Sequence, residues 1–199
     1  MIEIGSWAGE SAVLWANEIR NYEGKLLCID SWEPCKIKQI HKGAMPALMH
    51  KLLMKNVIFN LFMHNIKASG NNETIIPMKS SSAVILPHLK KGAFNMIYLD
   101  GGHHYSTVFK DLNDCGSLLK EGGLLCGDDL EIQYHQIKDK KLLHQNKNSK
   151  FIRCEESGTD YHPGVTNAVY DFFNCEVSSY NGFWVMRKID GSWKRVDLQ

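Results

Sequence analysis

Three aspartates and a histidine that follow two short apolar runs are the residues of this sequence best suited to chemistry. Asp100 follows one run, and His103 comes three residues later. Asp128 and Asp129 follow the other. Neighbouring parallel strands lie about 5 Å apart, so the three carboxylates would converge if both runs are strands of one parallel sheet. Such carboxylates repel one another, so one must stay protonated or the group must recruit a cation.

A divalent cation would remove that repulsion. Mg²⁺ is a hard cation that prefers oxygen ligands and water, and it fits a set made of Asp100, Asp128 and Asp129. A structural alternative stays open, in which Asp129 caps the turn that leads to Leu130 and Glu131 while Asp128 accepts hydrogen bonds from backbone amides. We expect the metal site.

His103 is the candidate general base. Imidazole has a pKa near neutrality, so a histidine in the turn above the sheet could remove a proton from a hydroxyl group. His104 would instead face the following helix. His162 could reach the site only if the long segment before it folds over the site.

A second group of candidate residues lies in the opening run Glu3-Ile4-Gly5-Ser6-Trp7-Ala8-Gly9-Glu10-Ser11. Gly5 and Gly9 separate an apolar run from an amphipathic segment, where backbone amides and a helix N-terminus can approach a ligand. The G-x-x-x-G spacing differs from that of dinucleotide and phosphate loops, so a pyrophosphate is not the first expectation. On spacing alone, a tight structural turn is an equal alternative.

Asp30 ends the apolar run from Leu26 to Ile29. A carboxylate at this point of a doubly wound sheet can accept hydrogen bonds from both hydroxyls of a ribose. The alternative is a cap for the turn at Ser31 and Trp32. The glycine run before it favours the ribose.

Apolar runs alternate with amphipathic segments, which is typical of βαβ units that build a parallel sheet covered by helices. The expected strands are residues 1–4, 26–29, 74–78, 94–99 and 124–126. The expected helices run through residues 12–19, 83–89 and 108–119. We therefore predict a Rossmann-like, doubly wound α/β fold with a mostly parallel sheet.

The last third of the chain has three further features. Residues 131–161 are polar and lysine-rich, with little periodic apolar content, so we expect a lid or substrate loop. Residues 163–173 suit a helix with proline in its first turn. Alternating runs flank Asn181-Gly182, which predicts an antiparallel hairpin at the C-terminal end of the sheet. Within residues 131–161, Tyr134, His135, His144 and Tyr161 would shape the pocket for a substrate.

Composition argues for a small-molecule partner. The 199 residues are 44% hydrophobic and 23% charged, and 23 Lys and Arg balance 22 Asp and Glu, so no overall field favours nucleic acid or an anionic membrane. No signal peptide is recognisable, and no apolar run approaches the roughly 20 residues that cross a bilayer. The six cysteines lack a C-x-x-C pair, which favours a reduced cytoplasm over a disulfide scaffold or zinc knuckle.

Four motifs carry a resemblance to a known family. They are the opening run 3–11, Tyr98-Leu99-Asp100-Gly101-Gly102-His103-His104-Tyr105, Gly127-Asp128-Asp129 and His162-Pro163-Gly164-Val165-Thr166-Asn167-Ala168-Val169. Together they resemble class I S-adenosylmethionine-dependent methyltransferases, in particular methyltransferase domain 24, related to catechol and macrolide-sugar O-methyltransferases. The resemblance covers Met1 to about Lys188 and implies one methyltransferase domain over residues 1–199.

The resemblance implies a site for S-adenosylmethionine as methyl donor. Glu3, Gly5 and Ser11 would line its methionine side. Asp30 would hold the ribose, and Ser82 would border the adenine or cap a helix, and both roles are compatible. The full set of expected donor-binding residues is Glu3, Gly5, Ser6, Trp7, Gly9, Ser11, Asp30, Ser31, Ser82 and Asp100.

The resemblance also bears on the metal and the base. Asp100, Asp128 and Asp129 match the metal carboxylates of the cation-dependent members, although those often have Asp-Asn or Glu-Asp at the last two positions. His103 stands where the catechol enzymes have a lysine. The family usually has helices before the first strand. None precedes it here, so we expect an open site, one completed by a second subunit of a homo-oligomer, or a truncated chain.

The expected function is metal-assisted O-methylation of a small hydroxylated molecule such as a sugar or natural product. The methyl group would pass in line to the acceptor oxygen while His103 takes the proton. One alternative is a metal-independent methyltransferase of the same fold, acting through His103 alone or on nitrogen. Others are a non-catalytic ligand-binding module and a nicotinamide-dependent oxidoreductase, which the glycine spacing and the terminal hairpin disfavour.

Overall fold

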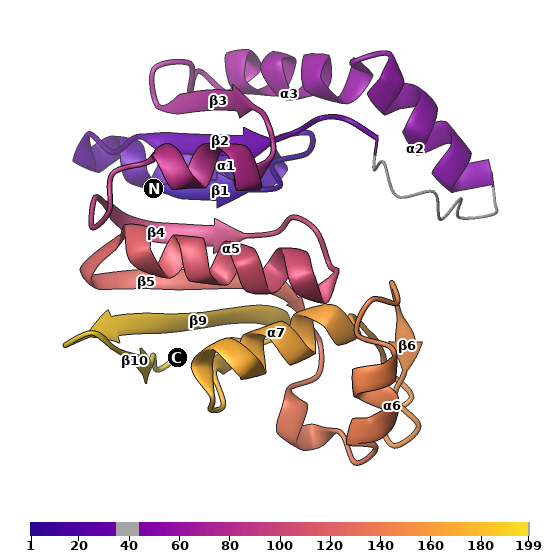
Figure 1. The fold of residues 1–199 in the computed structure, drawn as a ribbon. Helices are drawn as coiled ribbons and strands as arrows, with labels where there is room; N and C mark the ends of the chain where they lie inside the picture. Colours follow the sequence, from indigo (N-terminus) through magenta and orange to yellow (C-terminus); the bar gives the residue numbers. More distant parts are fainter. Residues whose placement is uncertain (35–43, 199) are drawn as a thin grey trace. The chain divides into compact units, whose positions relative to one another are not determined.

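The structure is a computed structural model that describes residues 1–34 and 44–198. The chain forms two units, one of Met1–Ile4 and Ala83–Gln199 and the other of Gly5–Ser82. Both alternate strands with helices (Figure 1). The predicted Rossmann-like α/β fold is confirmed.

The larger unit is built on parallel strands with an antiparallel C-terminal edge. Its parallel strands are β1 (Ile2–Ile4), β4 (Phe94–Leu99) and β5 (Leu119–Leu130). Its antiparallel strands are β8 (Ser178–Tyr180), β9 (Gly182–Ile189) and β10 (Ser192–Arg195). β4 lies between β1 and β5, while β9 pairs with β5 and carries β8 and β10. Strand β10 was not predicted from the sequence.

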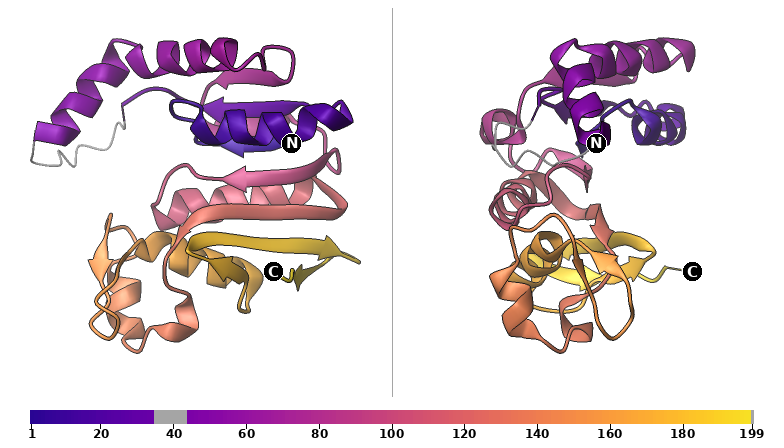
Figure 2. Two further views of the ribbon diagram at one scale, coloured as in Figure 1. Left: turned by 180° about the vertical axis from the view of Figure 1, so that it is seen from behind. Right: turned by 90° about the vertical axis from the view of Figure 1, so that its right-hand side faces the viewer.

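Two helices cover one face of the larger unit's strands, α5 (Tyr105–Leu118) and α7 (Pro163–Phe173) (Figure 2). α5 buries Val108, Leu112 and Cys115 at helical spacing, as predicted. α7 begins with proline, as its sequence predicts, and is buried along most of its length because it packs against α5 and the preceding segment. A short helix α4 (Ser82–Ile85) and a 3-10 turn (Leu86–His88) precede β4.

The hairpin predicted around Asn181-Gly182 is present. Tyr180 pairs with Phe183 across a two-residue turn. Asn181 has φ of 49° and Gly182 has φ of 89°, the positive values that a type I′ hairpin turn requires.

The smaller unit pairs β2 (Leu26–Asp30) in parallel with β3 (Ile75–Lys79). Its helices are α1 (Glu10–Ile19), α2 (Ala44–Met54) and α3 (Val57–Ala68), with a 3-10 turn at Arg20–Tyr22. α2 and α3 were not predicted. Ile58, Phe62 and Ile66, spaced four residues apart, form the buried face of α3 and were the available signal.

The segment between β5 and α7 has more structure than its polar composition predicts. It contains a 3-10 turn (Tyr134–Gln136), α6 (Lys140–Gln145), β6 (Ile152–Arg153) and β7 (Asp160–Tyr161). Its apolar side chains are too widely spaced to show a period, but they converge in a small cluster of their own. The cluster consists of Ile132, Ile137, Leu143, Cys154 and Tyr161.

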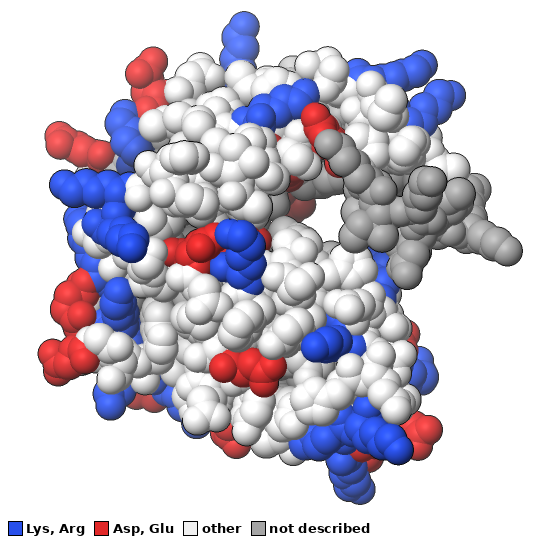
Figure 3. All heavy atoms as spheres, viewed as in Figure 1, with Lys and Arg blue, Asp and Glu red and all other residues white. Residues whose placement is uncertain are grey.

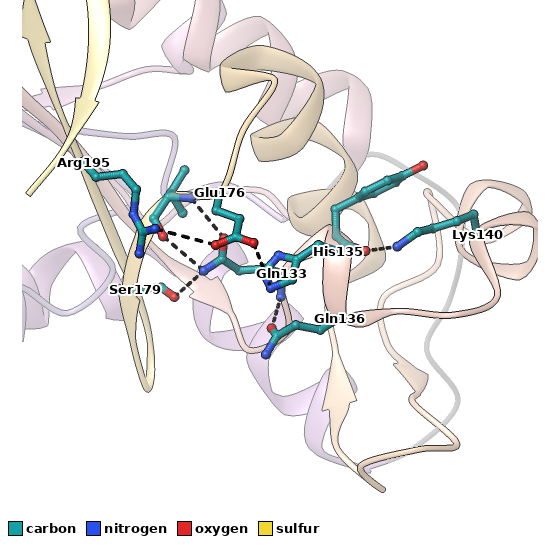
Figure 4. Close-up of polar contacts among 9 residues, drawn as sticks. Gln133, His135, Gln136, Lys140, Glu176, Ser179 and Arg195 are labelled. Carbon is teal, nitrogen blue, oxygen red and sulfur yellow. Dashed lines mark hydrogen bonds and ion pairs between the residues drawn. The ribbon is translucent and has the colours of Figure 1, made fainter.

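Polar contacts attach the start of this segment to the C-terminal strands (Figure 4). The side chain of Gln133 donates to Val177 O at 3.1 Å and to Ser179 Oγ at 2.8 Å, and it accepts from the Val177 amide at 3.0 Å. His135 pairs with Glu176 at 3.4 Å. The segment is therefore fixed at its first turn, and its role as a lid stays a prediction.

Surface charges and cysteines agree with the composition. Figure 3 shows acidic and basic side chains interspersed on one face, in line with a net charge of +1. Cys28, Cys115, Cys126 and Cys154 are buried, Cys175 is exposed, and Cys35 lies outside the described residues. No helix in residues 1–34 and 44–198 combines the length and apolar character needed to span a membrane.

The hairpin turn gives a stability test. Asn181→Val should lower the free energy of unfolding by about 1–2 kcal/mol, because a β-branched side chain is strained at positive φ. Asn181→Gly should leave stability nearly unchanged, because glycine adopts positive φ readily. Urea unfolding of both variants measures the difference. Equal stability of the valine variant and the parent chain would contradict the assigned turn.

Helix α7 gives a second test, at Gly164. A Cβ there would overlap the carbonyl oxygen of His103 and lie 2.7 Å from that of Lys147. Because these are backbone atoms that cannot rotate away, we expect Gly164→Ala to cost at least about 3 kcal/mol of unfolding free energy.

The matched control is Gly116→Ala, a helical glycine in α5. Its Cβ would meet the side-chain ends of Phe172 at 3.1 Å and Trp193 at 3.4 Å, which can shift. Alanine also gains helix propensity, so this variant should stay within about 1 kcal/mol of the parent. Similar losses in both variants, measured by urea unfolding, would show that space at residue 164 is not limiting.

Candidate functional site

The register of β4 and β5 places the predicted aspartates at the same end of the two strands. Leu99 pairs with Gly127, so Asp100 and Asp128 are the next residues on each strand. The Asp100 amide donates to Ile4 O at 2.8 Å, which holds the chain in place as it leaves β4. The two strand ends therefore lie at the same edge of the larger unit, while convergence of the three carboxylates on one point stays a prediction.

Asp128 and Asp129 lie in a bulge of β5. The pairing with β9 shifts between Gly127 and Leu130, and Asp129 adopts a left-handed conformation with φ of 66°. This turn brings Asp129 Oδ2 to 2.8 Å from His103 Nε2. Asp128 instead has Oδ1 beside Gly182, 3.1 Å from where a Cβ of that residue would lie.

His162 joins this group because the segment before α7 folds back onto it. The imidazole rings of His103 and His162 have centroids 4.2 Å apart, and Phe151 contacts the His162 ring at 4.1 Å. His162 Nδ1 lies 3.6 Å from Asp129 Oδ1. The condition that the sequence left open for His162 is met.

Glu131 fixes the position of His162. Its Oε1 lies 2.9 Å from His162 Nδ1, and its Oε2 accepts from the His162 amide at 3.1 Å. Glu131 was not among the residues predicted for the site. Strand alternation gave no signal for it, because Glu131 follows the end of β5 and the bulge at Asp129 interrupts the alternation.

The electrostatics follow from crowded negative charge. Burial, and then the charges of Asp129, Asp128 and Glu3, raise the pKa of Asp100 to about 7. Burial also acts to raise the pKa of Asp129, but the hydrogen bond from His103 and the charges of His103 and His162 lower it overall. Asp129 is therefore the stably ionised carboxylate of the pair, and Asp100 is the one that resists ionisation.

The side chains of this site can accept or donate protons, and three of them could hold a metal ion. His103, Asp129 and His162 each offer one ligand atom, and the three atoms lie within 4.8 Å of one another. Asp100 and Asp128, the other two predicted metal ligands, lie at the same edge but outside this group. A pocket beside them is lined by Gly102, His103, Asp128, Asp129, Asp111, Val165 and Trp184, together with Ile4, Leu99, Gly101 and Val108.

From Gly5 onward, the predicted donor loop lies in the smaller unit. Trp7 has φ of 43°, and its amide donates to Asp30 Oδ2 at 3.0 Å. Asp30 Oδ1 accepts from the Trp32 amide at 2.7 Å, and the Trp32 indole donates to Trp7 O at 2.7 Å. Asp30 thus has the turn-capping role, while its contact with a ribose stays a prediction.

Other predicted donor-binding residues lie near strand ends and helix starts. Ser11 is in the first turn of α1, Ser82 begins α4, and Ser31 Oγ accepts from the Glu33 amide at 3.3 Å. Ser6 is buried, and its Oγ has no hydrogen-bond partner within the described part of the chain. In the larger unit, Glu3 is fully buried on β1 opposite Tyr98. Their contacts with a donor stay predictions.

Comparison with known proteins agrees with this architecture. A family described as a methyltransferase domain matches residues 2–130. The O-methyltransferase NovP is 14% identical over 95% of this chain and 71% of its own, with a TM-score of 0.62. No protein with a curated description matches the sequence.

Two further solved structures share the fold. TomG, an O-methyltransferase from Streptomyces achromogenes involved in tomaymycin synthesis and solved in complex with SAM, is 13% identical, covering 94% of this chain and 72% of its own, with a TM-score of 0.59. An O-methyltransferase from Bacillus cereus in complex with SAH is 14% identical, with coverage of 94% and 72% and a TM-score of 0.53. The family match spans well over half of the chain, which therefore belongs to the methyltransferase domain family and is a class I S-adenosylmethionine-dependent methyltransferase.

Proposed function

We propose that this enzyme methylates a hydroxyl oxygen of a small molecule, such as a sugar or natural product, with the help of a divalent cation. The observation that carries the proposal is the 2.8 Å contact between His103 Nε2 and Asp129 Oδ2. It supplies an oriented base at the edge where Asp100 follows β4 and Asp128 lies near the end of β5.

His103 would remove the acceptor proton. When Nε2 carries the proton shared with Asp129, the lone pair on Nδ1 can accept the hydroxyl proton, and the Asp129 carboxylate stabilises the resulting imidazolium. The acceptor oxygen forms a bond to the methyl carbon as the carbon–sulfur bond breaks. The bonding electrons pass to sulfur, which leaves a neutral thioether.

The carboxylates fit a divalent cation. The raised pKa of Asp100 shows that burial and three neighbouring carboxyl groups oppose its ionisation, and a cation would relieve this opposition. Asp100, Asp128 and Asp129 would hold it, with Mg²⁺ as the expected ion. When bound, the cation would lower the pKa of the acceptor hydroxyl and orient it.

Oxygen as the acceptor atom is supported by the neighbours. NovP, TomG and the Bacillus cereus protein are O-methyltransferases at 13–14% identity. The segment 131–161 would select the acceptor, because it ends beside His162, whose ring contacts that of His103.

The base is tested by His103→Ala and His103→Gln. With labelled donor and a panel of hydroxylated acceptors, kcat should fall by about 10²- to 10⁴-fold in both variants. Donor affinity, measured by calorimetry, should stay within about twofold, because the base acts on the acceptor. His88→Ala, which changes an exposed histidine, is the control. A loss of less than tenfold would remove His103 from this role.

The cation is tested by Asp100→Asn. The pKa of Asp100, about 7 against an ordinary 3.8, means that the folded chain keeps a proton that the unfolded chain releases. The free energy of unfolding therefore falls as pH rises toward about 7. With chelator present, the variant should be more stable than the parent at about pH 8, by a margin that shrinks towards about pH 5.

Added Mg²⁺ should then raise the unfolding temperature of the parent and leave that of Asp100→Asn unchanged, because a ligand stabilises only the state that binds it. Full methyl-transfer activity in excess chelator would instead favour a metal-independent enzyme of the same fold. Methylation of amines but not of hydroxylated acceptors would reject oxygen as the acceptor atom.

A further inference from the structure

Two residues beside the proposed base have no part in the proposed reaction, His162 and Glu131. His162 is 4% exposed, although an imidazole carries polar nitrogen atoms that need partners. One face of its ring meets His103, and Phe151 also contacts it. Glu131 fixes both its backbone amide and its Nδ1. The ring is thus held in one place, next to Asp129.

The spacing of the candidate ligand atoms suits a metal ion. Ligand atoms about 2.1 Å from a tetrahedral ion lie about 3.4 Å from one another. His103 Nε2 lies 2.8 Å from Asp129 Oδ2, and His162 Nδ1 lies 3.6 Å from Asp129 Oδ1. Small side-chain shifts would bring His103, Asp129 and His162 to this spacing, since their ligand atoms already lie within 4.8 Å of one another.

The chemical type of the ligand atoms determines which metal ion fits the site. Two imidazole nitrogens and one carboxylate suit Zn²⁺, Co²⁺ or Ni²⁺, whereas Mg²⁺ prefers oxygen ligands alone. His162 Nδ1 lies 2.9 Å from Glu131 Oε1, to which it donates its proton. Binding of the ion at Nδ1 would release that proton to solvent and leave Glu131 Oε1 as a further negative oxygen beside the ion. The side chains of His103 and Asp129 are 34% and 23% exposed, so an ion can enter from solvent.

We propose that His103, Asp129 and His162 bind a transition-metal ion of the Zn²⁺ class, and that this ion inhibits methyl transfer. A neutral imidazole has one nitrogen lone pair, so a His103 that ligates the ion has its other nitrogen protonated and cannot accept a proton. The ion also takes Asp129 from the Mg²⁺ set. The inhibition rests on the proposed function, whereas the binding does not.

Binding is tested with Co²⁺ as a spectroscopic probe of the full chain. The parent should bind one Co²⁺ with visible absorption of a low-coordinate nitrogen–oxygen site. His162→Ala and His162→Gln should weaken this binding at least about tenfold, since even outer-shell changes have such effects. His144→Ala, a histidine of the same segment, is the matched control and should bind like the parent. Equal affinity in all four proteins would overturn the site.

A second measurement does not depend on the folding of the variants. X-ray absorption at the cobalt edge of the parent chain counts its imidazole ligands, and two are expected. Fewer than two would overturn the proposal even if the His162 variants were unfolded.

Inhibition is tested in the Mg²⁺-supported assay. Zn²⁺ should inhibit the parent at concentrations near its measured dissociation constant, and His162→Gln should need at least about tenfold more. Zn²⁺ binding to the two histidines without inhibition would reject the regulatory part. If no acceptor is methylated, the proposed function fails, while the cobalt measurements still decide the metal site.

Discussion

Negative charge concentrated at the end of β4 and β5 is the constraint around which the larger unit is arranged. Strand register alone brings Asp100 and Asp128 to one edge, and burial raises the pKa of Asp100. The pKa of Asp129 is lowered instead, because the bulge in β5 turns its carboxylate toward His103. His103 and His162 lie beside the carboxylates and lower the pKa of Asp129. The proposed cations would offset the remaining negative charge.

The positions of these carboxylates were predictable because they depend on strand ends. Apolar runs identified β4 and β5, and parallel strands place their carboxyl ends together. The bulge was not predictable, because the left-handed conformation of Asp129 depends on pairing with β9, over fifty residues later. The hairpin turn at Asn181-Gly182 was predictable for the opposite reason, since its conformation depends on those two residues alone.

His162 and the segment before it show a different limit of sequence reasoning. Residues 131–161 have few apolar side chains, and none repeats at a helical or strand period. Their cluster depends on contacts between distant residues such as Ile132 and Tyr161. The sequence therefore could not say whether His162 reaches His103. Helix α3, by contrast, had a readable helical period in Ile58, Phe62 and Ile66.

Both ends of the segment between β5 and α7 belong to the site, since Glu131 opens it and His162 follows it. Between those ends the segment has its own apolar cluster, and its first turn is attached to the C-terminal strands through Gln133 and His135. The interior of the segment can therefore vary while its two ends, Glu131 and His162, keep their positions. Insertions, deletions or wholesale replacement within it would change which acceptor is admitted while His103 and His162 keep their spacing. Diversification of substrate range would then require no change in the sheet.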